Sequence, residues 1–442
     1  MEQRMLEKEA MDMKKIRKLA AVTLVGTMAI SLFTACGNSG GETKTEDGKT
    51  LVRFSVGGSA GELAQYEKAV DAFNEQSDTV QVEMTGLPGD NYNEKIMTSL
   101  NSKTAPDCFY SEEATFGELE KSGMLLDLTE FLESEDSSLK TADVPESILK
   151  NFMYEDNIYG VPVDCNPMVI YYNKDLIESL GLQSPQELYD AGEWNFAALQ
   201  EMAEALRDAG NVGFVYENYW APLYSVISSD PDSLYSEDMS TAYFDSDRVT
   251  EGLTWLNDNI QSDAFTYAGT LESGESADTL FVSGKAGMLY AGRWFVADFT
   301  DLSFTYDVVP FPYYQSPEEV LSAMPSSPMV INKKTENPEA VWEFISFYCG
   351  EEGQRLRMEG QGNAVPTIEG LEDIVLTGEP EHAQYFLDAV DISFTYPSAE
   401  ATHPGLTDAL NEEVEKMLVG EQDVATTQSN LQSLATEMLA EE

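Results

Sequence analysis

The amino-acid sequence predicts an α/β protein with more than one domain, and three observations lead to this prediction. The chain has 442 residues, which is longer than most single domains, and 42% of them are hydrophobic. Apolar residues recur with period two in some segments and with helical period in others. The two patterns alternate along the chain, as they do where parallel strands are joined by covering helices.

The first third of the chain shows this alternation most clearly. Period-two patterns predict strands over 51–58, 79–85 and 106–110. Between them, apolar residues at helical spacing predict one helix around 63–73 and another around 92–100. The order strand, helix, strand, helix, strand predicts an open, mainly parallel sheet covered by helices.

The rest of the chain continues with a strand and several helices. Residues 168–182 predict a buried strand that runs into a helix, with Gly181 as its end. Three further apolar stripes are flanked by residues that favour a helix start or end. They predict helices over 195–210, 249–260 and 337–350, with the start residues Asn195, Asp245 or Asp247, and Asn337 with Pro338, and the end residues Gly210 and Gly350. The last sixty residues are acidic and are also predicted to be helical.

The N-terminal region is typical of a secretory signal peptide over residues 1–35. A basic cluster at 14–18 precedes an almost uncharged run that ends at Ala35. The run is also long enough to span a bilayer, so a retained membrane anchor is the alternative. Translation could begin at Met1, Met11 or Met13, because the first twelve residues are unusually acidic for a signal peptide.

Cys36 lies where the apolar run stops. The junction of Ala35, Cys36 and Gly37 resembles the lipobox of bacterial lipoproteins, whose cysteine is lipidated and becomes the first residue of the mature chain. Residues 37–49 hold no large apolar side chain, which predicts a flexible tether over 36–49. We therefore expect an extracytoplasmic protein that is held at the cell membrane only by its lipidated cysteine.

Composition narrows the possible partners. The chain carries 79 acidic and 25 basic residues, a net charge of −54. Such a charge argues against nucleic acid, whose phosphates need clustered Lys and Arg, and against adhesion to anionic lipid. The other cysteines, Cys108, Cys165 and Cys349, are widely spaced, and the chain has only two histidines. We therefore expect buried free thiols, no metal site and no cofactor.

Four segments together resemble a known family. They are "PDCFYSEEATFGELEKSGMLLDLTEF" (106–131), "GVPVDCNPMVIYYNKDLIESLGL" (160–182), "FVSGKAGMLYAGRW" (281–294) and "VINKKTENPEAVWEFISFYCGEEGQ" (330–354). In this order they are similar to extracellular solute-binding proteins of the maltose-binding type, which deliver ligands to the membrane subunits of ABC importers.

This resemblance implies a two-lobed fold like that of periplasmic binding proteins, with a hinged cleft between the lobes. Each lobe would be a mainly parallel sheet flanked by helices. The first lobe would comprise 50–163 and 286–332, and the second 164–285 and 333–442. The resemblance further implies a monomer that captures a solute by lobe closure, and the solute would be a sugar or oligosaccharide.

Tryptophans are the first candidates for binding a sugar, because its apolar C–H faces stack on aromatic rings. Trp220 and Trp294 stand beside polar residues at an element start and a strand end, and the resemblance implies that aromatics of their segments line the cleft. The alternative is that either ring belongs to a core, since tryptophans are usually well buried. Trp255 and Trp342 lie on apolar helix stripes and are predicted to be core.

Sugar hydroxyl groups also need polar partners. Glu112, Asp164 and Arg293 are the first choices because they follow predicted strands or precede a candidate ring. The second choices are Ser59 and Glu62, which follow the first predicted strand, and Asn363 in "GQGNAVP". In so acidic a chain, any one of these carboxylates is equally explained as a solvated surface charge.

Other functions stay open at this point. Glu112 and Glu113 could be the paired carboxylates of a secreted glycosidase, although sequence neighbours rarely face each other across a scissile bond. Tyrosine pairs at 171–172 and 313–314 could bind ferric iron, and the acidic residues could bind a polyamine. A peptide ligand is a further alternative to the sugar.

Overall fold

The computed structural model describes residues 44–440, with gaps at residues 90–91, 101, 103–104, 136, 155, 274, 300–301, 320–321 and 361. The predicted signal peptide, Cys36 and residues 37–43 of the predicted tether lie outside the described residues. Residues 44–49 form a hydrogen-bonded turn instead of a flexible tether. The Thr45 N–H donates to the Lys49 carbonyl at 3.0 Å, and Lys44 pairs with Thr50 at the start of the first strand.

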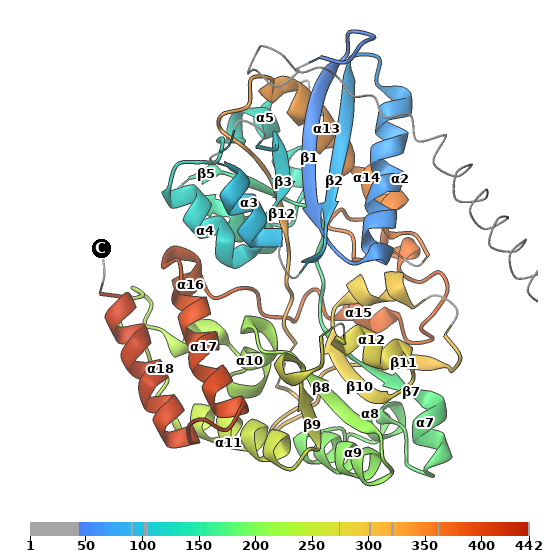
Figure 1. Ribbon diagram of the computed structural model, residues 1–442, viewed down its shortest axis with the longest axis vertical. Coiled ribbons are helices and arrows are strands. Elements are labelled where there is room, and N and C mark those ends of the chain that lie inside the picture. The colour runs from blue at the N-terminus through green and yellow to red at the C-terminus, as the bar shows by residue number, and fades with distance from the viewer. Residues whose placement is uncertain are drawn as a thin grey trace, which may run out of the picture. The chain divides into compact units, whose positions relative to one another are not determined.

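Two five-stranded sheets organise the described chain, and Figure 1 shows one above the other. The first sheet has the order β2 (Val80–Leu87), β1 (Thr50–Gly57), β3 (Cys108–Tyr110), β12 (Pro328–Ile331) and β6 (Gly160–Pro162). The second has the order β11 (Tyr306–Val309), β7 (Val169–Asn173), β10 (Ala286–Ala291), β8 (Val212–Tyr216) and β9 (Phe265–Tyr267). A small two-stranded ladder joins β4 (Met153–Tyr154) and β5 (Asn157–Ile158).

Each sheet is mixed, whereas the sequence predicts mainly parallel sheets. Two of the four strand pairings in each sheet are parallel and two are antiparallel. In the first sheet β2, β1 and β3 run parallel, while β12 is antiparallel to both of its neighbours. In the second, β10, β8 and β9 run parallel, while β7 is antiparallel to both of its neighbours. The two reversed strands, β12 and β7, are those that receive the chain from the other sheet. A strand that enters from the cleft side begins where its neighbours end, so it must run against them.

Helices cover both sheets. Around the first sheet lie α2 (Ala60–Gln76), α3 (Tyr92–Leu100), α4 (Glu113–Lys121), α5 (Thr129–Glu133), α6 (Glu146–Leu149), α13 (Pro338–Tyr348) and α14 (Glu351–Met358). Around the second lie α7 (Lys174–Ser179), α8 (Pro185–Asp190), α9 (Phe196–Asp208), α10 (Trp220–Ile227), α11 (Asp247–Gln261), α12 (Ala277–Val282), α15 (Gln384–Asp388), α16 (Ser398–Thr402), α17 (Leu406–Leu418) and α18 (Val424–Met438).

Most predicted helix boundaries agree with the structure to within two residues. The Asn195 side chain caps α9 by accepting the Ala198 N–H at 3.1 Å, and Gly181 ends the turn after α7 with a φ of +69°. The start of α11 differs, because the capping residue is Ser246 and neither Asp245 nor Asp247. The Ser246 hydroxyl accepts the Val249 N–H, which has no partner within the helix. An aspartate carboxylate can accept such an N–H equally well, so the sequence alone does not distinguish Ser246 from its two neighbours.

The expected lobe boundaries need correction, because two segments lie with the other sheet. Residues 286–309, expected in the first lobe, form β10 and β11 of the second sheet. Residues 338–358, expected in the second lobe, form α13 and α14, which pack on the first sheet and on α2. The Phe344 ring of α13 lies 5.3 Å from that of Phe54 in β1, so aromatic packing holds this helix on the first sheet.

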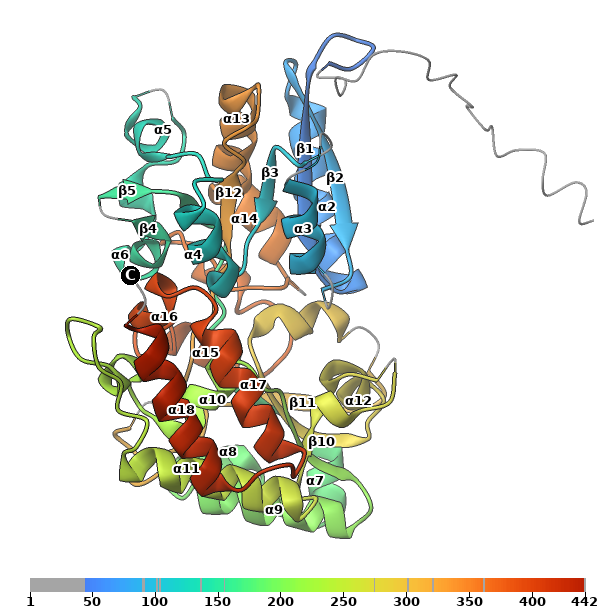
Figure 2. The same cartoon turned by 60° about the vertical axis from the view of Figure 1, so that its left-hand side comes forward.

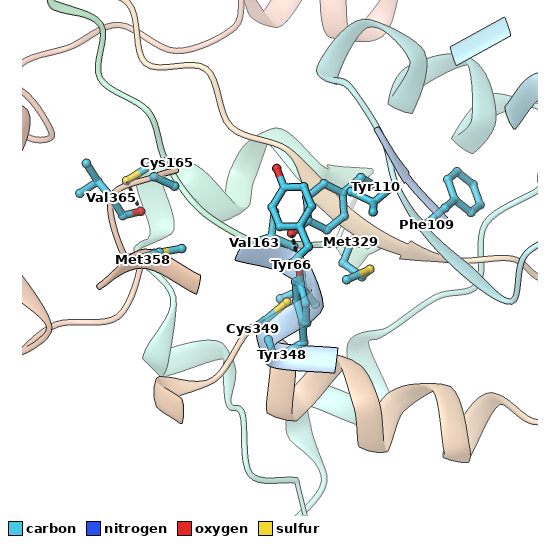
Figure 3. Packing of buried hydrophobic residues seen from close by; sticks show 14 of the residues in the cluster. Tyr66, Phe109, Tyr110, Val163, Cys165, Met329, Tyr348, Cys349, Met358 and Val365 are labelled. Carbon is cyan, nitrogen blue, oxygen red and sulfur yellow. Dashed lines mark hydrogen bonds between the residues drawn. The ribbon is translucent and has the colours of Figure 1, made fainter. Parts of the chain in front are cut away.

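The chain therefore crosses between the sheets at residues 163–168, at 310–327 and after α14. The crossing segments hydrogen-bond to one another. The Val163 N–H donates to the Ser327 carbonyl at 3.0 Å, and Cys165 and Val365 exchange two backbone hydrogen bonds. Figure 3 shows Cys165 directly beside Val365. Three mutually bonded crossovers are the kind of connection about which two lobes can bend while each stays rigid.

Cys108, Cys165 and Cys349 are buried free thiols, as predicted. Burial raises the pKa of each of these thiols. They are packing residues among the apolar side chains of the first core.

Candidate functional site

The strands of the first sheet end at one edge, and this edge opens onto a cavity of about 240 Å³, hereafter the inner cavity. The parallel strands β1 and β3 end at Gly57 and Tyr110, and the reversed strand β12 begins beside them with Ser326 and Ser327 just before it. Polar groups after parallel strands meet at the same edge of a sheet, which is where open α/β sheets hold their ligands.

The inner cavity opens into a larger cavity of about 870 Å³, hereafter the outer cavity. The two share wall residues from both lobes, including Glu62, Glu112 and Trp294. The outer cavity also reaches Trp220 at the start of α10 and Thr407 in α17. Together the inner and outer cavities form a continuous cleft between the two lobes.

Two carboxylates stand at the inner end of the cleft. Glu62 accepts the Ser59 backbone N–H at 2.9 Å and the Tyr66 hydroxyl at 3.3 Å. Its pKa is raised to about 7, chiefly because the surrounding walls desolvate the carboxylate. Asp164 is only 4% exposed, and burial raises its pKa to about 6. The Asn166 amide donates to Asp164 at 3.3 Å.

The neighbouring residues Glu112 and Glu113 lie in different environments. The Glu112 side chain is reached by solvent inside the cleft, and the walls around it raise its pKa through desolvation. Glu113 is buried and accepts the Ser326 backbone N–H at 3.1 Å. Burial raises its pKa, and the Trp220 side chain is one of the groups that counteract this rise. Because Glu113 belongs to α4 and Trp220 to α10, this interaction is made between the two lobes.

The two candidate tryptophans have different exposures. Trp294 is partly exposed and lines both cavities. Its ring folds back over Gly292, where a Cβ atom would lie only 2.1 Å from the ring, so glycine is required there. Trp220 lines the outer cavity but is only 6% exposed, and its ring packs edge-on against Tyr396 at 5.4 Å. Trp220 thus lies in the cleft wall and in a core at once.

Arg293 does not lie where the sequence analysis expects it. The side chain is 1% exposed and does not line either cavity. Its guanidinium group donates to the carbonyl oxygens of Met358, Gly360 and Ala364 at 3.1, 2.7 and 2.7 Å. The fork of N–H groups therefore secures the segment after α14, where the chain begins its third crossing. Arg293 is a structural residue in this geometry.

The second-choice residues lie at the cleft. Ser59 caps α2 and lines the outer cavity, where its hydroxyl accepts the Glu62 N–H at 3.2 Å. Asn363 lines the inner cavity, is 1% exposed, and donates to the Tyr66 hydroxyl at 2.8 Å. The structure thus brings Ser59, Glu62, Asp164 and Asn363 to one cleft, together with Glu112 and both tryptophans.

Comparison with known proteins decides the family. The model of the bacterial extracellular solute-binding proteins matches residues 57–355 of the chain. The chain belongs to this family. The resemblance stated from the four sequence segments is therefore confirmed, and so is the two-lobed α/β fold of these solute-binding proteins.

Curated relatives and solved structures agree with this assignment. The chain is 22% identical over 360 residues to a maltooligosaccharide ABC transporter solute-binding lipoprotein of Streptococcus pneumoniae, covering 80% of this chain and 81% of the relative. It is 23% identical over 372 residues to a galactooligosaccharide-binding protein of Bacillus subtilis, covering 81% and 82%. The ABC substrate-binding protein Lmo0181 of Listeria monocytogenes, solved with cycloalternan, has a TM-score of 0.79 at 21% identity and covers 89% of this chain and 100% of that protein.

Several lining residues of this solute-binding protein escape sequence reasoning. Tyr66, Tyr92 and Tyr110 lie on apolar stripes or in a strand, so the sequence predicts them as core, yet they also form the floor of the inner cavity. Figure 3 shows Tyr66 and Tyr110 close to Tyr348, and the Tyr110 hydroxyl donates to that of Tyr348 at 2.9 Å. The signal that could have found Ser326 is the "PSSP" segment directly before β12.

The remaining tryptophans and the tyrosine pairs occupy structural positions. Trp342 is buried within the first core cluster, and Trp255 is partly buried and packs against the second. The hydroxyl groups of Tyr171, Tyr172, Tyr313 and Tyr314 each have a hydrogen-bond partner in the protein, respectively Gly292, Asp307, Gly192 and Glu251. These pairs therefore give no support to a ferric-iron site.

A group of possible metal ligands lies outside the cleft. Asp307, Glu381 and His382 come together on the second lobe. Lys174 pairs with Asp307 at 3.4 Å and with Glu381 at 3.1 Å, and His382 Nδ1 lies 2.8 Å from Asp307. An ammonium group already balances both carboxylates, so the arrangement is explained as an ion-pair network. Within the described part of the chain, no helix is both long and apolar enough to cross a membrane.

Proposed function

We propose that this solute-binding protein captures a sugar, and most specifically an oligosaccharide, in the cleft and delivers it unaltered to an ABC importer. The observation that carries the proposal is the partly exposed Trp294 ring, which stands beside Asp164 and Asn363 in the inner cavity. Such a ring offers a stacking face for sugar C–H groups, and the neighbouring oxygens accept hydrogen bonds from hydroxyl groups. The oligosaccharides named for several relatives support the same class of solute.

Contacts across the cleft indicate how capture would work. The Gly61 N–H of α2 donates to Asp298 at 3.2 Å, and Asp298 follows β10 of the second sheet. On the other side, α4 packs on α16, and Figure 2 shows α16 directly beneath α4. A solute that touches both lobes would favour such contacts, because it gains its extra interactions only when the lobes are closed.

An enzyme reading has less support from the same geometry. A glycosidase needs two carboxylates that face each other across the scissile bond. Glu112 is exposed in the cleft, whereas Glu113, in the wall of the outer cavity, is 8% exposed and its carboxylate already accepts the Ser326 N–H. We therefore propose that the protein binds its sugar without hydrolysing it.

The function is tested by titrating the purified mature protein with neutral oligosaccharides in a calorimeter. We expect saturable 1:1 binding of at least one α-glucan or galactan oligosaccharide, with the recovered sugar unchanged by chromatography. Small-angle scattering of the same samples should show a smaller radius of gyration with the bound sugar than without it. Hydrolysis of the tightest ligand would move the protein to the enzymes, and the absence of binding by every oligosaccharide would overturn the proposed function.

We further propose that a lipid on Cys36 holds the protein, as a monomer, on the outer side of the cell membrane beside the importer. The support is the sequence junction at Ala35 and Cys36 and the lipoprotein name of the Streptococcus pneumoniae relative. Cys36→Ala should release the protein from the membrane fraction or leave the signal peptide uncut. A variant that stays anchored with the same N-terminus as the parent would show that the anchor lies elsewhere.

A further inference from the structure

The inner cavity retains hydrogen-bond acceptors that no protein group uses. Asn363 is 1% exposed and Asn166 is 7% exposed, and both line the inner cavity. The side-chain oxygen of each is buried and has no hydrogen-bond partner within the described residues. A buried amide oxygen without a partner is costly, so a ligand that supplies donors here would remove this cost.

The donors around the same cavity are largely engaged by the protein. The Asn166 amide donates to Asp164 at 3.3 Å, and the Asn363 amide donates to Tyr66 at 2.8 Å. Tyr66 in turn donates to Glu62, and the Tyr92 hydroxyl contacts the Ser55 and Tyr110 carbonyl groups at 3.0 and 2.8 Å. In most of the hydrogen bonds that these side chains can still form with a ligand, the side chain is therefore the acceptor.

The charged side chains of the cleft also favour a ligand that donates hydrogen bonds, because those that line it are acidic. Glu62, Glu112 and Asp164 line the inner cavity, and four more carboxylates line the outer one, Glu113, Glu217, Asp278 and Asp408. Among the described residues, no lysine or arginine lines either cavity. Arg357, whose positive charge acts on Asp164, is fully buried and donates to the Val163 carbonyl at 2.8 Å. Two of its other donor atoms, Nε and Nη1, have no hydrogen-bond partner within the described residues, but Arg357 is not among the residues that line either cavity.

The unused acceptors and the acidic lining residues favour some classes of sugar over others. A protonated amino group brings three donors, no acceptor and a positive charge, whereas a phosphate or carboxylate brings acceptors and a negative charge. A neutral hydroxyl group donates once and lies between the two. Hydrogen bonds from a charged donor to a carboxylate are roughly twice as strong as neutral ones.

We propose that the inner cavity is built for a sugar that carries a protonated amino group, held between the carboxylates of Glu62 and Asp164 and the amide oxygens of Asn166 and Asn363. This inference rests on the proposed capture of a sugar and narrows its class to cationic amino sugars. Sugars that carry phosphate or uronate groups are rejected by the same groups, because they place a negative charge among carboxylates with no basic side chain to receive it.

The test compares matched sugars on the mature protein by calorimetry at 150 mM salt. The neutral parents are maltotriose and β-1,4-galactotriose, and each is paired with its 2-amino-2-deoxy analogue and its 6-carboxylate analogue. For the parent that binds, we expect the amino analogue to bind about tenfold more tightly, as one charge-assisted hydrogen bond would give. The carboxylate analogue should bind more weakly than the parent. Spermidine serves as an amine without a sugar.

Variants identify the groups responsible. Glu62→Gln and Asp164→Asn keep the shape and remove one charge each, so each should lose most of the preference for the amino analogue. Glu67→Gln is the matched control, because Glu67 lies on the same helix as Glu62 but on its exposed face. This control should keep the full preference. Circular dichroism melting of each variant shows whether the fold is retained, and a neutral parent that still binds shows that the cleft is intact.

The outcomes separate this inference from the proposed function. If neutral parents bind and the amino analogues bind no more tightly, the amino-sugar inference is overturned while sugar capture stands. Equal or tighter binding of a carboxylate analogue overturns it as well. If spermidine binds and no sugar does, the proposed function fails and so does the sugar part of the inference. No binding by any of the probes overturns both.

Discussion

The two lobes present different chemistry to the same cleft. The edge of the first sheet supplies oxygen atoms, from Glu62, Glu112 and the residues around Ser326, while the crossing after β6 adds Asp164. The edge of the second sheet supplies the two tryptophan rings, with Trp294 after β10 and Trp220 after β8, whereas the rings that the first lobe contributes are those of Tyr66, Tyr92 and Tyr110. A sugar needs both kinds of surface, one for its hydroxyl groups and one for its C–H faces. Because residues of both lobes line the cleft, affinity should depend on how the lobes meet.

Two neighbouring residues at the edge of the second sheet sharpen this comparison. Arg293 and Trp294 are adjacent in sequence, yet Trp294 lines the cleft and Arg293 is buried against backbone carbonyl groups. A short 3₁₀ helix at Arg293–Asp298 turns consecutive side chains to different sides. Mutations at the two positions should therefore affect different quantities, stability for one and affinity for the other.

The largest expected effect is a loss of stability in Arg293→Met. The substitution leaves the carbonyl groups of Met358, Gly360 and Ala364 without their buried donors, and this should lower the free energy of unfolding by about 3 kcal/mol. Urea denaturation followed by tryptophan fluorescence measures the change. Arg355→Met is the control, since Arg355 is an exposed partner of Asp373 and should change stability little.

The opposite result at Arg293 would be equally informative. If Arg293→Met retained its stability but lost sugar binding, the guanidinium group would belong to the ligand site as the sequence analysis expects. The comparison between the two neighbours would then fail.

The next effect is a loss of affinity in Trp294→Ala. Removing the stacking face should weaken sugar binding by about 1–3 kcal/mol, by analogy with bases that stack on aromatic rings. The free energy of unfolding should change less than in Arg293→Met, because Trp294 is partly exposed. Calorimetric titration measures the affinity. Phe295→Ala, which removes a ring from the outer cavity only, should cost less, and an equal cost would place the sugar further out.

The fold was largely open to prediction from sequence, because it depends on local patterns. Strand β1 and helix α2 follow from the spacing of apolar residues, and Val52, Phe54, Tyr66, Val70 and Phe73 of this pattern are buried. Which lobe a segment joins depends on partners far away in the chain. Strand β10 has the same apolar character as a strand of either sheet, and only its pairing with β7 and β8 assigns it to the second.

Residues of the site could be predicted from the sequence where their position after a strand or at the start of a helix is enough to place them at the cleft. Glu112, Asp164 and Glu62 follow strands or begin a helix, so their place at the cleft could be inferred. The direction of a side chain could not, because it depends on which partner is nearer. Arg293 donates to three carbonyl groups of a segment more than sixty residues away in the chain, and no local sequence pattern predicts these hydrogen bonds. The same holds for Trp220, whose core packing on Tyr396 appears only in the fold.

The third expected effect concerns the interaction between Glu113 of the first lobe and Trp220 of the second. Trp220→Phe keeps most of the ring packing on Tyr396 but removes the polar N–H group of the indole, which is the group that can act on the Glu113 carboxylate. If this interaction stabilises the closed form, sugar affinity should fall by about 1 kcal/mol. A double-mutant cycle with Glu113→Ala tests the coupling, since Trp220→Phe should cost nothing further when Glu113 is absent. Additive losses would show that the two residues act separately.

The smallest expected effect is a pH dependence of stability that arises from Glu62 on the polar side of the cleft. Its pKa is about 7 in the folded protein and near 4.5 in the unfolded chain, so the folded state holds a proton that the unfolded state releases. The contribution of this group to the free energy of unfolding therefore falls as pH rises from about 4.5 to 7 and is level above that.

Glu62→Gln, which can still accept the Ser59 N–H, removes this pH dependence. Relative to the parent, the variant should gain stability through this window and keep a gain of under about 1 kcal/mol at pH 8, because solvent reaches part of the side chain. Urea denaturation at pH 4.5, 6 and 8 measures the difference, with Glu67→Gln as the exposed control on the same helix. A difference between Glu62→Gln and the parent that does not grow with pH would mean that the carboxylate is charged throughout, and the first lobe would then hold a full negative charge at the inner end of the cleft even without a ligand.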